Sequence, residues 1–113
     1  MKRHIHLIIF LFASAGGCQT KIPNFNGDAA FAHLVAQCDF GPRNPGSVGH
    51  QKALEYYLNI LSPLADSVMT QPFIETMPRT KEKVEMHNVI AQFNLDAKKQ
   101  IMLSAHWDTR AWG

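Results

Sequence analysis

The chain has 113 residues, of which 46% are hydrophobic and 18% charged, a composition typical of one small globular domain and unlike that of disordered or collagen-like proteins. Its formal net charge of +2 at pH 7 includes Lys2 and Arg3 at the extreme N-terminus. Without these two, nine basic side chains (11 minus two) face nine acidic ones, so a nucleic-acid-binding role has no electrostatic support.

Residues 1–17 have the outline of a signal peptide, because two basic residues precede a mainly apolar run over 5–15 and small residues follow it. The run of about 11 residues is well short of the roughly 20 that a membrane-spanning helix needs. The small residues before Cys18 also resemble the lipobox of bacterial lipoproteins, in which this cysteine is acylated; a plain secretory signal is the alternative. We expect an exported protein on the periplasmic side of a bacterial envelope, held to the membrane by a lipid on Cys18.

Acylation of Cys18 would leave Cys38 without a partner, so no disulfide framework is expected even in an oxidising compartment. Cys38 is then predicted to be a buried core thiol, and a Cys18–Cys38 bridge is the alternative. Residues 18–27 are polar and include proline and glycine, which is typical of a tether between an anchor and a folded domain.

Two helices are predicted after the tether. Asp28 can cap the first, which extends to Cys38 with one apolar stripe at positions i, i+3, i+4 and i+7. His33 lies off that stripe, and we expect it to be exposed. Ser47 can cap the second helix, which runs to about Leu61 and is ended by the proline that follows.

Between the helices, residues 40–47 contain two prolines and two glycines, which exclude regular structure and predict a shaped loop. Arg43 lies between the two prolines. We expect its side chain to donate hydrogen bonds to backbone carbonyls, and a clamp on a substrate carboxylate is the alternative interpretation.

Two strands are predicted over 66–73 and 86–93 from their β-branched and aromatic residues, joined as an antiparallel pair by a charged, exposed and mobile link over 75–85. Residues 100–105 form a nearly continuous apolar run, which is typical of a third strand buried on both faces. The order helix, helix, strand, strand, strand indicates an α/β or α+β fold with helices packed against a sheet.

His106 and Asp108 directly follow the predicted third strand, at the place where α/β sheets bind their ligands. Their side chains, two residues apart on extended backbone, point roughly the same way, so Asp108 can orient the imidazole or touch the surroundings of a metal. Imidazole is a common zinc ligand, and its second nitrogen is usually held by a carboxylate or carbonyl. Trp107, between them, either packs in the core or lines a substrate pocket.

Three separated segments, 37–47, 87–91 and 104–110, resemble the M28 family of zinc hydrolases, above all its glutaminyl cyclases (glutaminyl-peptide cyclotransferases) of the bacterial exported type. They read Gln-Cys-Asp-Phe-Gly-Pro-Arg with Pro-Gly-Ser, His-Asn-Val-Ile-Ala, and Ser-Ala-His-Trp-Asp-Thr-Arg. The resemblance implies an α/β fold in which helices flank a mixed central sheet, a phosphorylase/hydrolase-like zinc peptidase fold. Residues 28–113 would be the N-terminal part of that catalytic domain, truncated at Gly113.

The resemblance also implies an activity: cyclisation of N-terminal glutamine to pyroglutamate with release of ammonia, in peptides with a free N-terminus and with zinc as the cofactor. The histidine that matches His106 is a ligand in the two-zinc aminopeptidases but lies beside the metal in the single-zinc cyclases, and Asp108 is the catalytic candidate. The remaining ligands, an aspartate, a glutamate and a late histidine, are expected beyond Gly113, so these 113 residues alone are predicted to be inactive. An M28 two-zinc aminopeptidase and a non-catalytic truncated lipoprotein are the alternatives.

Overall fold

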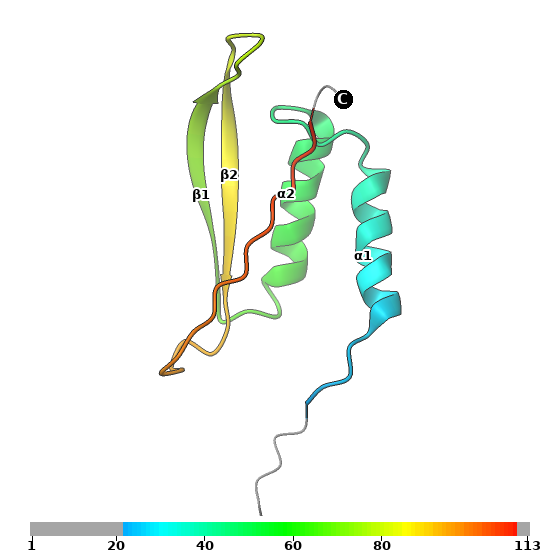
Figure 1. Ribbon diagram of the computed structural model, residues 1–113, viewed down its shortest axis with the longest axis vertical. Coiled ribbons are helices and arrows are strands. Elements are labelled where there is room, and N and C mark those ends of the chain that lie inside the picture. The colour runs from blue at the N-terminus through cyan, green and yellow to red at the C-terminus, as the bar shows by residue number, and fades with distance from the viewer. Residues whose placement is uncertain (1–21, 111–113) are drawn as a thin grey trace, which may run out of the picture.

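The computed structural model describes residues 22–110, which form two helices and one β-hairpin. In chain order these elements are α1 (Gly27–Asp39), α2 (Val48–Leu61), β1 (Ser67–Thr76) and β2 (Lys83–Gln92). Figure 1 shows α2 between the hairpin and α1, with the segment after β2 running back across them. The predicted signal peptide and the acylated cysteine lie outside the described residues. Within residues 22–110 no helix is both long and apolar enough to cross a membrane.

Helix α1 begins slightly earlier than predicted, and Asn26 rather than Asp28 is its cap. The Asn26 side-chain oxygen accepts a hydrogen bond from the Ala29 amide at 3.0 Å, which satisfies one of the free N–H groups of the first turn. Asp28 instead lies in that first turn, where its charge complements the helix dipole. The prediction of Asp28 as the cap is therefore wrong by two residues.

The apolar stripe of α1 is not buried by any described element. Phe31, Leu34 and Val35 are 65%, 52% and 43% exposed, and α1 contains no buried residue. Cys38 lies on the same stripe and is exposed, so the prediction of a buried core thiol is wrong. The periodicity correctly located the helix, but burial also needs a neighbour over the stripe. His33 is exposed as predicted, and its Nδ1 lies 2.6 Å from the Tyr56 hydroxyl.

Helix α2 forms the core of the described chain. Ser47 caps it as predicted, since its hydroxyl accepts a hydrogen bond from the His50 amide at 3.1 Å, and the helix ends at Leu61 before the proline. Among the described residues, the buried side chains larger than glycine are His50, Ala53 and Leu54, all on this helix.

The two strands pair antiparallel as predicted, but the hairpin is longer. Its register runs from Ser67 opposite Gln92 to Thr76 opposite Lys83, so only residues 77–82 form the link. Two of the charged residues that favoured a loop over 75–85 are instead paired with apolar partners, Glu75 opposite Val84 and Glu85 opposite Ile74. Glu75 and Glu85 are both exposed, so water can solvate their charges without opening the ladder.

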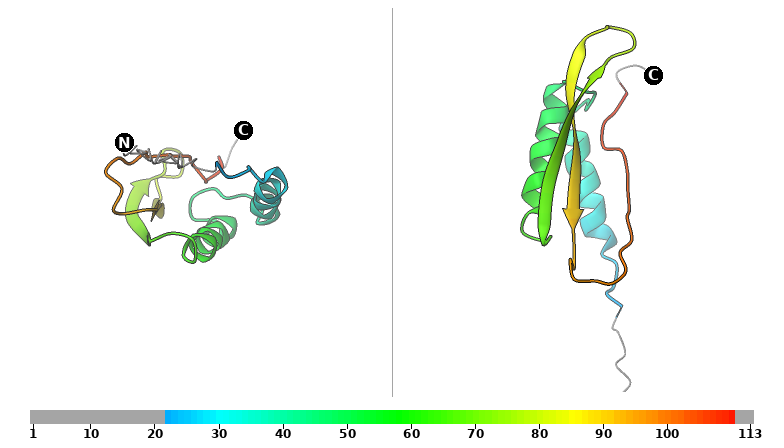
Figure 2. Two further views of the ribbon diagram at one scale, coloured as in Figure 1. Left: turned by 90° about the horizontal axis from the view of Figure 1, so that it is seen from below. Right: turned by 90° about the vertical axis from the view of Figure 1, so that its left-hand side faces the viewer.

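The predicted third strand is not formed. Residues 100–105 are without regular structure, and Ile101, Met102 and Leu103 are 90%, 89% and 91% exposed instead of buried. Within residues 22–110 the sheet has two strands, β1 and β2, and Figure 2 shows the following segment running beside the hairpin without joining it. A strand needs a hydrogen-bonded neighbour, and the described chain places none next to these residues. The observed architecture is a small mixed α/β arrangement, compatible with part of a larger α/β fold.

Candidate functional site

A junction between the loop over 40–47 and residues 107–109 brings together two of the motif segments. The backbone amide of Arg43 donates to the Thr109 hydroxyl at 2.8 Å, and the Thr109 amide donates to the Arg43 carbonyl at 3.2 Å. The Arg43 guanidinium donates to the Trp107 carbonyl at 3.1 Å and to the Gln37 carbonyl at 2.6 Å. The prediction that this arginine serves backbone carbonyls is confirmed, and its hydrogen bonds fix the end of the segment against the α1–α2 loop.

The shape of this loop depends on its glycines. Gly41 and Gly46 have φ angles of 75° and 81°, a left-handed conformation that residues with a Cβ atom rarely adopt. Gly49, in the first turn of α2, lies so close to the loop that a Cβ atom there would be 2.2 Å from the Pro42 carbonyl oxygen. Ser47 adds a hydrogen bond from its hydroxyl to that same oxygen at 2.9 Å. Helix α2 and the loop are therefore packed backbone to backbone.

Trp107 packs against aromatic side chains of α2. Its ring stacks on the His50 imidazole with centroids 4.3 Å apart and an interplanar angle of 14°, and it meets the Tyr57 ring edge-on at 5.7 Å. The Tyr57 hydroxyl in turn donates to the Gln37 side-chain oxygen at 2.5 Å. Of the two interpretations of Trp107, packing is the one that these contacts support, although one edge of the ring also borders the groove described below.

His50 is a residue of this junction that the sequence analysis missed. It is 5% exposed, and burial lowers the pKa of its imidazole, an effect that the nearby Asp108 charge opposes and that His87 reinforces. The imidazole under Trp107 is therefore neutral at neutral pH. Its spacing to Ala53, Leu54 and Tyr57 is i, i+3, i+4 and i+7, and this periodic signal could have identified it as part of the buried face.

His106 and Asp108 lie together at the exposed rim of the junction. The His106 Nδ1 is 3.0 Å from the backbone oxygen of Asp108 and 3.5 Å from its carboxylate, so the carbonyl is the nearer partner. Because a carbonyl oxygen only accepts, this contact requires the proton on Nδ1 and leaves the lone pair on Nε2. The His106 side chain is 87% exposed, so Nε2 is accessible as a ligand or a base. The roles predicted for both residues stay predictions.

The described residues alone do not make a metal site. Nowhere in residues 22–110 do three His, Cys, Asp or Glu side chains come together closely enough to hold a metal ion. His87, from the second motif segment, has its Nε2 3.3 Å from a Glu85 carboxylate oxygen. Structural and catalytic zinc sites use three or more protein ligands. The His106–Asp108 pair therefore falls short of a zinc-binding set, and no catalytic step through a metal follows from these residues.

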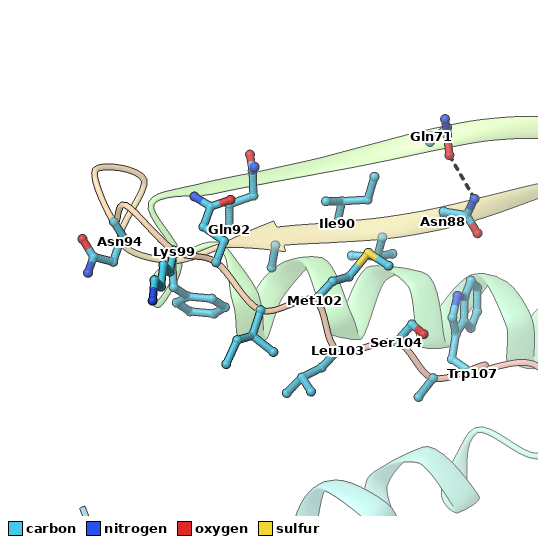
Figure 3. Close-up of a pocket in the computed structure, with 17 residues that line it drawn as sticks. Gln71, Asn88, Ile90, Gln92, Asn94, Lys99, Met102, Leu103, Ser104 and Trp107 are labelled. Carbon is cyan, nitrogen blue, oxygen red and sulfur yellow. Dashed lines mark hydrogen bonds between the residues drawn. The ribbon is translucent and has the colours of Figure 1, made fainter. Parts of the chain in front are cut away.

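A groove separates β2 from the segment after it, and Trp107 closes one end (Figure 3). Its volume is about 860 Å³, and its walls come from β2 on one side and from residues 99–105 on the other. A smaller apolar space of about 350 Å³ shares several of these residues and reaches the helix at Tyr57 and Leu61. Trp107 thus lies at one end of this open groove, whereas neither His106 nor Asp108 lines it.

Comparison with known proteins finds one relationship. The chain is 33% identical over 69 residues to the glutaminyl-peptide cyclotransferase of Drosophila melanogaster, an alignment that covers 61% of this chain and 19% of the relative. The aligned part thus spans about a fifth of the relative's length. No family-wide sequence profile and no solved structure matches the chain. The chain is therefore a small mixed α/β protein with a distant relationship to glutaminyl-peptide cyclotransferase.

Proposed function

We propose that this chain is the N-terminal part of an exported, zinc-dependent glutaminyl-peptide cyclotransferase of the M28 family. The similarity to the Drosophila melanogaster cyclotransferase carries the proposal. The junction supports it, because the Arg43 hydrogen bonds to Trp107 and the pairing with Thr109 join two motif segments that are more than sixty residues apart in sequence. Nearly a fifth of the relative is aligned, so the remainder of the catalytic domain would be supplied by further polypeptide.

The proposed reaction closes the side chain of an N-terminal glutamine onto its own amine. The α-nitrogen forms a bond to the γ-carbonyl carbon, the bond from that carbon to the amide nitrogen breaks, and one proton passes from the attacking to the leaving nitrogen as ammonia departs. The substrate class is therefore a peptide with a free N-terminus. Zinc is the proposed cofactor of the whole protein, with its remaining ligands outside residues 22–110.

His106 and Asp108 would stand at the edge of this site. The exposed Nε2 of His106 is the accessible atom, while the Asp108 carbonyl holds Nδ1 and so sets the tautomer. In this arrangement Asp108 is a positioning residue, and Arg43 and His50 hold the segment that carries the pair through their contacts with Trp107.

The proposal includes export and a lipid anchor on Cys18, with the periplasmic side of the membrane as the location. Mass spectrometry of the mature protein tests this part directly. We expect an N-terminal acylated Cys18 and a free Cys38 thiol, which is exposed and accessible to alkylation. A Cys18–Cys38 disulfide, or a processed N-terminus elsewhere, would contradict the anchor without touching the proposed activity.

A two-zinc aminopeptidase is the second candidate, favoured by one observation. The His106 side chain is 87% exposed with Nε2 free, which is the state a metal ligand needs before metal binding. The short alignment, in turn, would also suit a non-catalytic lipoprotein.

One experiment separates these three possibilities. The complete open reading frame that contains this chain is expressed, and the purified protein is given a peptide with N-terminal glutamine and a matched peptide with N-terminal leucine. We expect ammonia and a pyroglutamyl product from the first peptide only, with one zinc ion per chain. Release of free leucine with two zinc ions would identify the aminopeptidase, and no turnover of either peptide would favour the non-catalytic protein.

A further inference from the structure

The first turn of α1 begins with an asparagine that is followed by a glycine. Asn26 caps the helix, and its side-chain oxygen accepts a hydrogen bond from the Ala29 amide at 3.0 Å. Gly27 is the first residue of the helix, and both Asn26 and Gly27 are exposed. A backbone amide attacks the preceding asparagine side chain most readily when it belongs to glycine, because glycine has no Cβ atom to obstruct the approach.

The Gly27 amide nitrogen is free to react. It belongs to the N–H groups of a first helical turn that lack an intrahelical partner, and within residues 22–110 it makes no other hydrogen bond. The Ala29 N–H and the positive end of the helix dipole both stabilise negative charge on the Asn26 side-chain oxygen. Such charge develops when a nucleophile adds to the Asn26 Cγ carbon, so the helix end favours that addition electrostatically.

Asn26 is the one asparagine in the sequence that is followed by glycine. The others precede proline or bulkier side chains; they are Asn24, Asn44, Asn59, Asn88 and Asn94. Asn88, for example, precedes a valine within β2, and its side-chain nitrogen donates to the Gln71 side-chain oxygen at 3.0 Å. The combination of a glycine neighbour, a free amide and an activated side-chain carbonyl therefore belongs to Asn26.

We propose that Asn26 is a self-modification site, at which the Gly27 amide nitrogen attacks the Asn26 side chain and ammonia is released. The Gly27 nitrogen loses its proton and forms a bond to Cγ. The bond from Cγ to the side-chain nitrogen breaks, and that nitrogen leaves as ammonia after taking up a proton. Residues 26 and 27 then share a succinimide ring. One water molecule opens the ring at either of its two C–N bonds, so water is the co-reactant.

The two products affect the cap in opposite ways. Breaking the bond between Cγ and the Gly27 nitrogen yields aspartate, whose carboxylate can accept from the Ala29 amide and whose charge suits a helix N-terminus. Breaking the other bond yields isoaspartate, in which the backbone continues through Cγ and the free carboxylate is attached directly to Cα. That carboxylate lies closer to the backbone and the chain gains an atom, so the isoaspartate form loses the cap.

Peptide mapping of the aged protein tests the reaction. The full chain is incubated in a mildly alkaline buffer and digested with trypsin, which releases residues 22–43 as one peptide because Lys21 precedes it and Arg43 ends it. We expect a gain of one mass unit at Asn26 in two chromatographically separate products. The rate should rise with pH, because the attacking nitrogen must lose its proton.

Gly27→Ala is the matched control. Its new Cβ atom would have only an ordinary contact, 3.8 Å from a Phe25 ring carbon, so the helix end is retained while the approach to Asn26 is obstructed. We expect much slower conversion in this variant. Equal rates in the two chains, conversion of another asparagine ahead of Asn26, or no conversion at all would overturn the proposal.

Amide hydrogen exchange at Ala29 tests the effect on the cap. We expect protection in the unchanged chain and in Asn26→Asp, because both carry a side-chain oxygen that accepts from this amide. Fast exchange is expected in the isolated isoaspartate form and in Asn26→Ala. An isoaspartate form whose Ala29 amide is as protected as that of the unchanged chain would contradict the loss of the cap.

Discussion

The last described segment consists of two parts that behave in opposite ways. Residues 107–109 are fixed by hydrogen bonds to Arg43 and by the stacking of Trp107 on His50. Residues 100–105, immediately before them, have no backbone partner within the described chain and expose their apolar side chains. The difference shows that polar contacts can fix a few residues locally, whereas an apolar run forms a strand only beside a hydrogen-bonded neighbour.

The largest expected effect comes from separating α2 from the loop over 40–47. Gly49→Ala puts a Cβ atom 2.2 Å from the Pro42 carbonyl oxygen, and because that oxygen belongs to the backbone the loop itself must move. We expect a loss of about 3 kcal/mol in the free energy of unfolding, the upper part of the range for overpacking. Urea denaturation followed by circular dichroism measures it.

Gly27→Ala is the control for this substitution. The nearest atom to its new Cβ would be a Phe25 ring carbon at 3.8 Å, an ordinary contact. We expect a change within about 0.5 kcal/mol, the usual effect of a surface substitution. Equal losses in the free energy of unfolding for the two variants would show that the close backbone contact at Gly49 does not limit the size of its side chain.

A smaller effect is expected when the junction loses its arginine. Arg43→Lys keeps the charge but cannot reach the Trp107 and Gln37 carbonyls together, because an ammonium lacks the fork of the guanidinium. We expect a loss of about 2 kcal/mol, in the range for hydrogen bonds to charged groups. Denaturation followed by tryptophan fluorescence checks it, with Lys52→Met on the exposed side of α2 as the control. Equal free energies of unfolding for Arg43→Lys and the unchanged chain would show that the hydrogen bonds of Arg43 do not stabilise the junction.

The pH dependence of the free energy of unfolding should reveal that the His50 imidazole is buried. Burial lowers the pKa of this histidine in the folded chain, so the unfolded chain binds its proton more readily. Stability is therefore fully present above the ordinary histidine value of 6.5 and falls as the pH is lowered through and below it. We expect His50→Phe, which preserves the stacking on Trp107, to lose less stability than the unchanged chain over that interval. An identical pH dependence in both proteins would contradict a buried neutral imidazole.

The smallest effect is expected at Asp108. The closer contact of His106 Nδ1 is with the Asp108 backbone oxygen, and Asp108→Asn leaves that oxygen in place. We expect the proton to stay on Nδ1 and the free energy of unfolding to change by less than about 0.5 kcal/mol. Nitrogen-15 NMR of the imidazole reports the tautomer. A shift of the proton to Nε2 would show that the carboxylate, and not the carbonyl, fixes this ring.

Local features of the fold were predictable from the sequence, and features that depend on distant neighbours were not. The Ser47 cap, the two helices and the antiparallel pair follow from capping and periodicity within a few residues. The apolar run over 100–105 has the composition of a buried strand. Burial also requires a neighbouring element, and the composition of the run does not show whether one is present. For the same reason the apolar stripe of α1, including Cys38, was expected inside and lies outside.

The candidate site was predictable in part. His106, Trp107 and Asp108 were identified from their place after an apolar run, and the hydrogen-bonding role of Arg43 follows from its position between two prolines. His50 belongs to none of the motif segments, and only its place on the apolar face of α2 distinguishes it in the sequence. The contact between Gly49 and the loop has no sequence signal of its own, since a glycine in a first helical turn has many possible causes.

Amide hydrogen exchange across residues 100–109 tests the central claim most directly, namely that residues 107–109 are held by the chain and that residues 100–105 have no backbone partner within residues 22–110. The account predicts a protected Thr109 amide at every protein concentration, because it donates to the Arg43 carbonyl. It predicts fast exchange at Met102, whose amide has no backbone partner within residues 22–110. Fast exchange at Thr109, or protection of Met102 equal to that of Thr109, would contradict it.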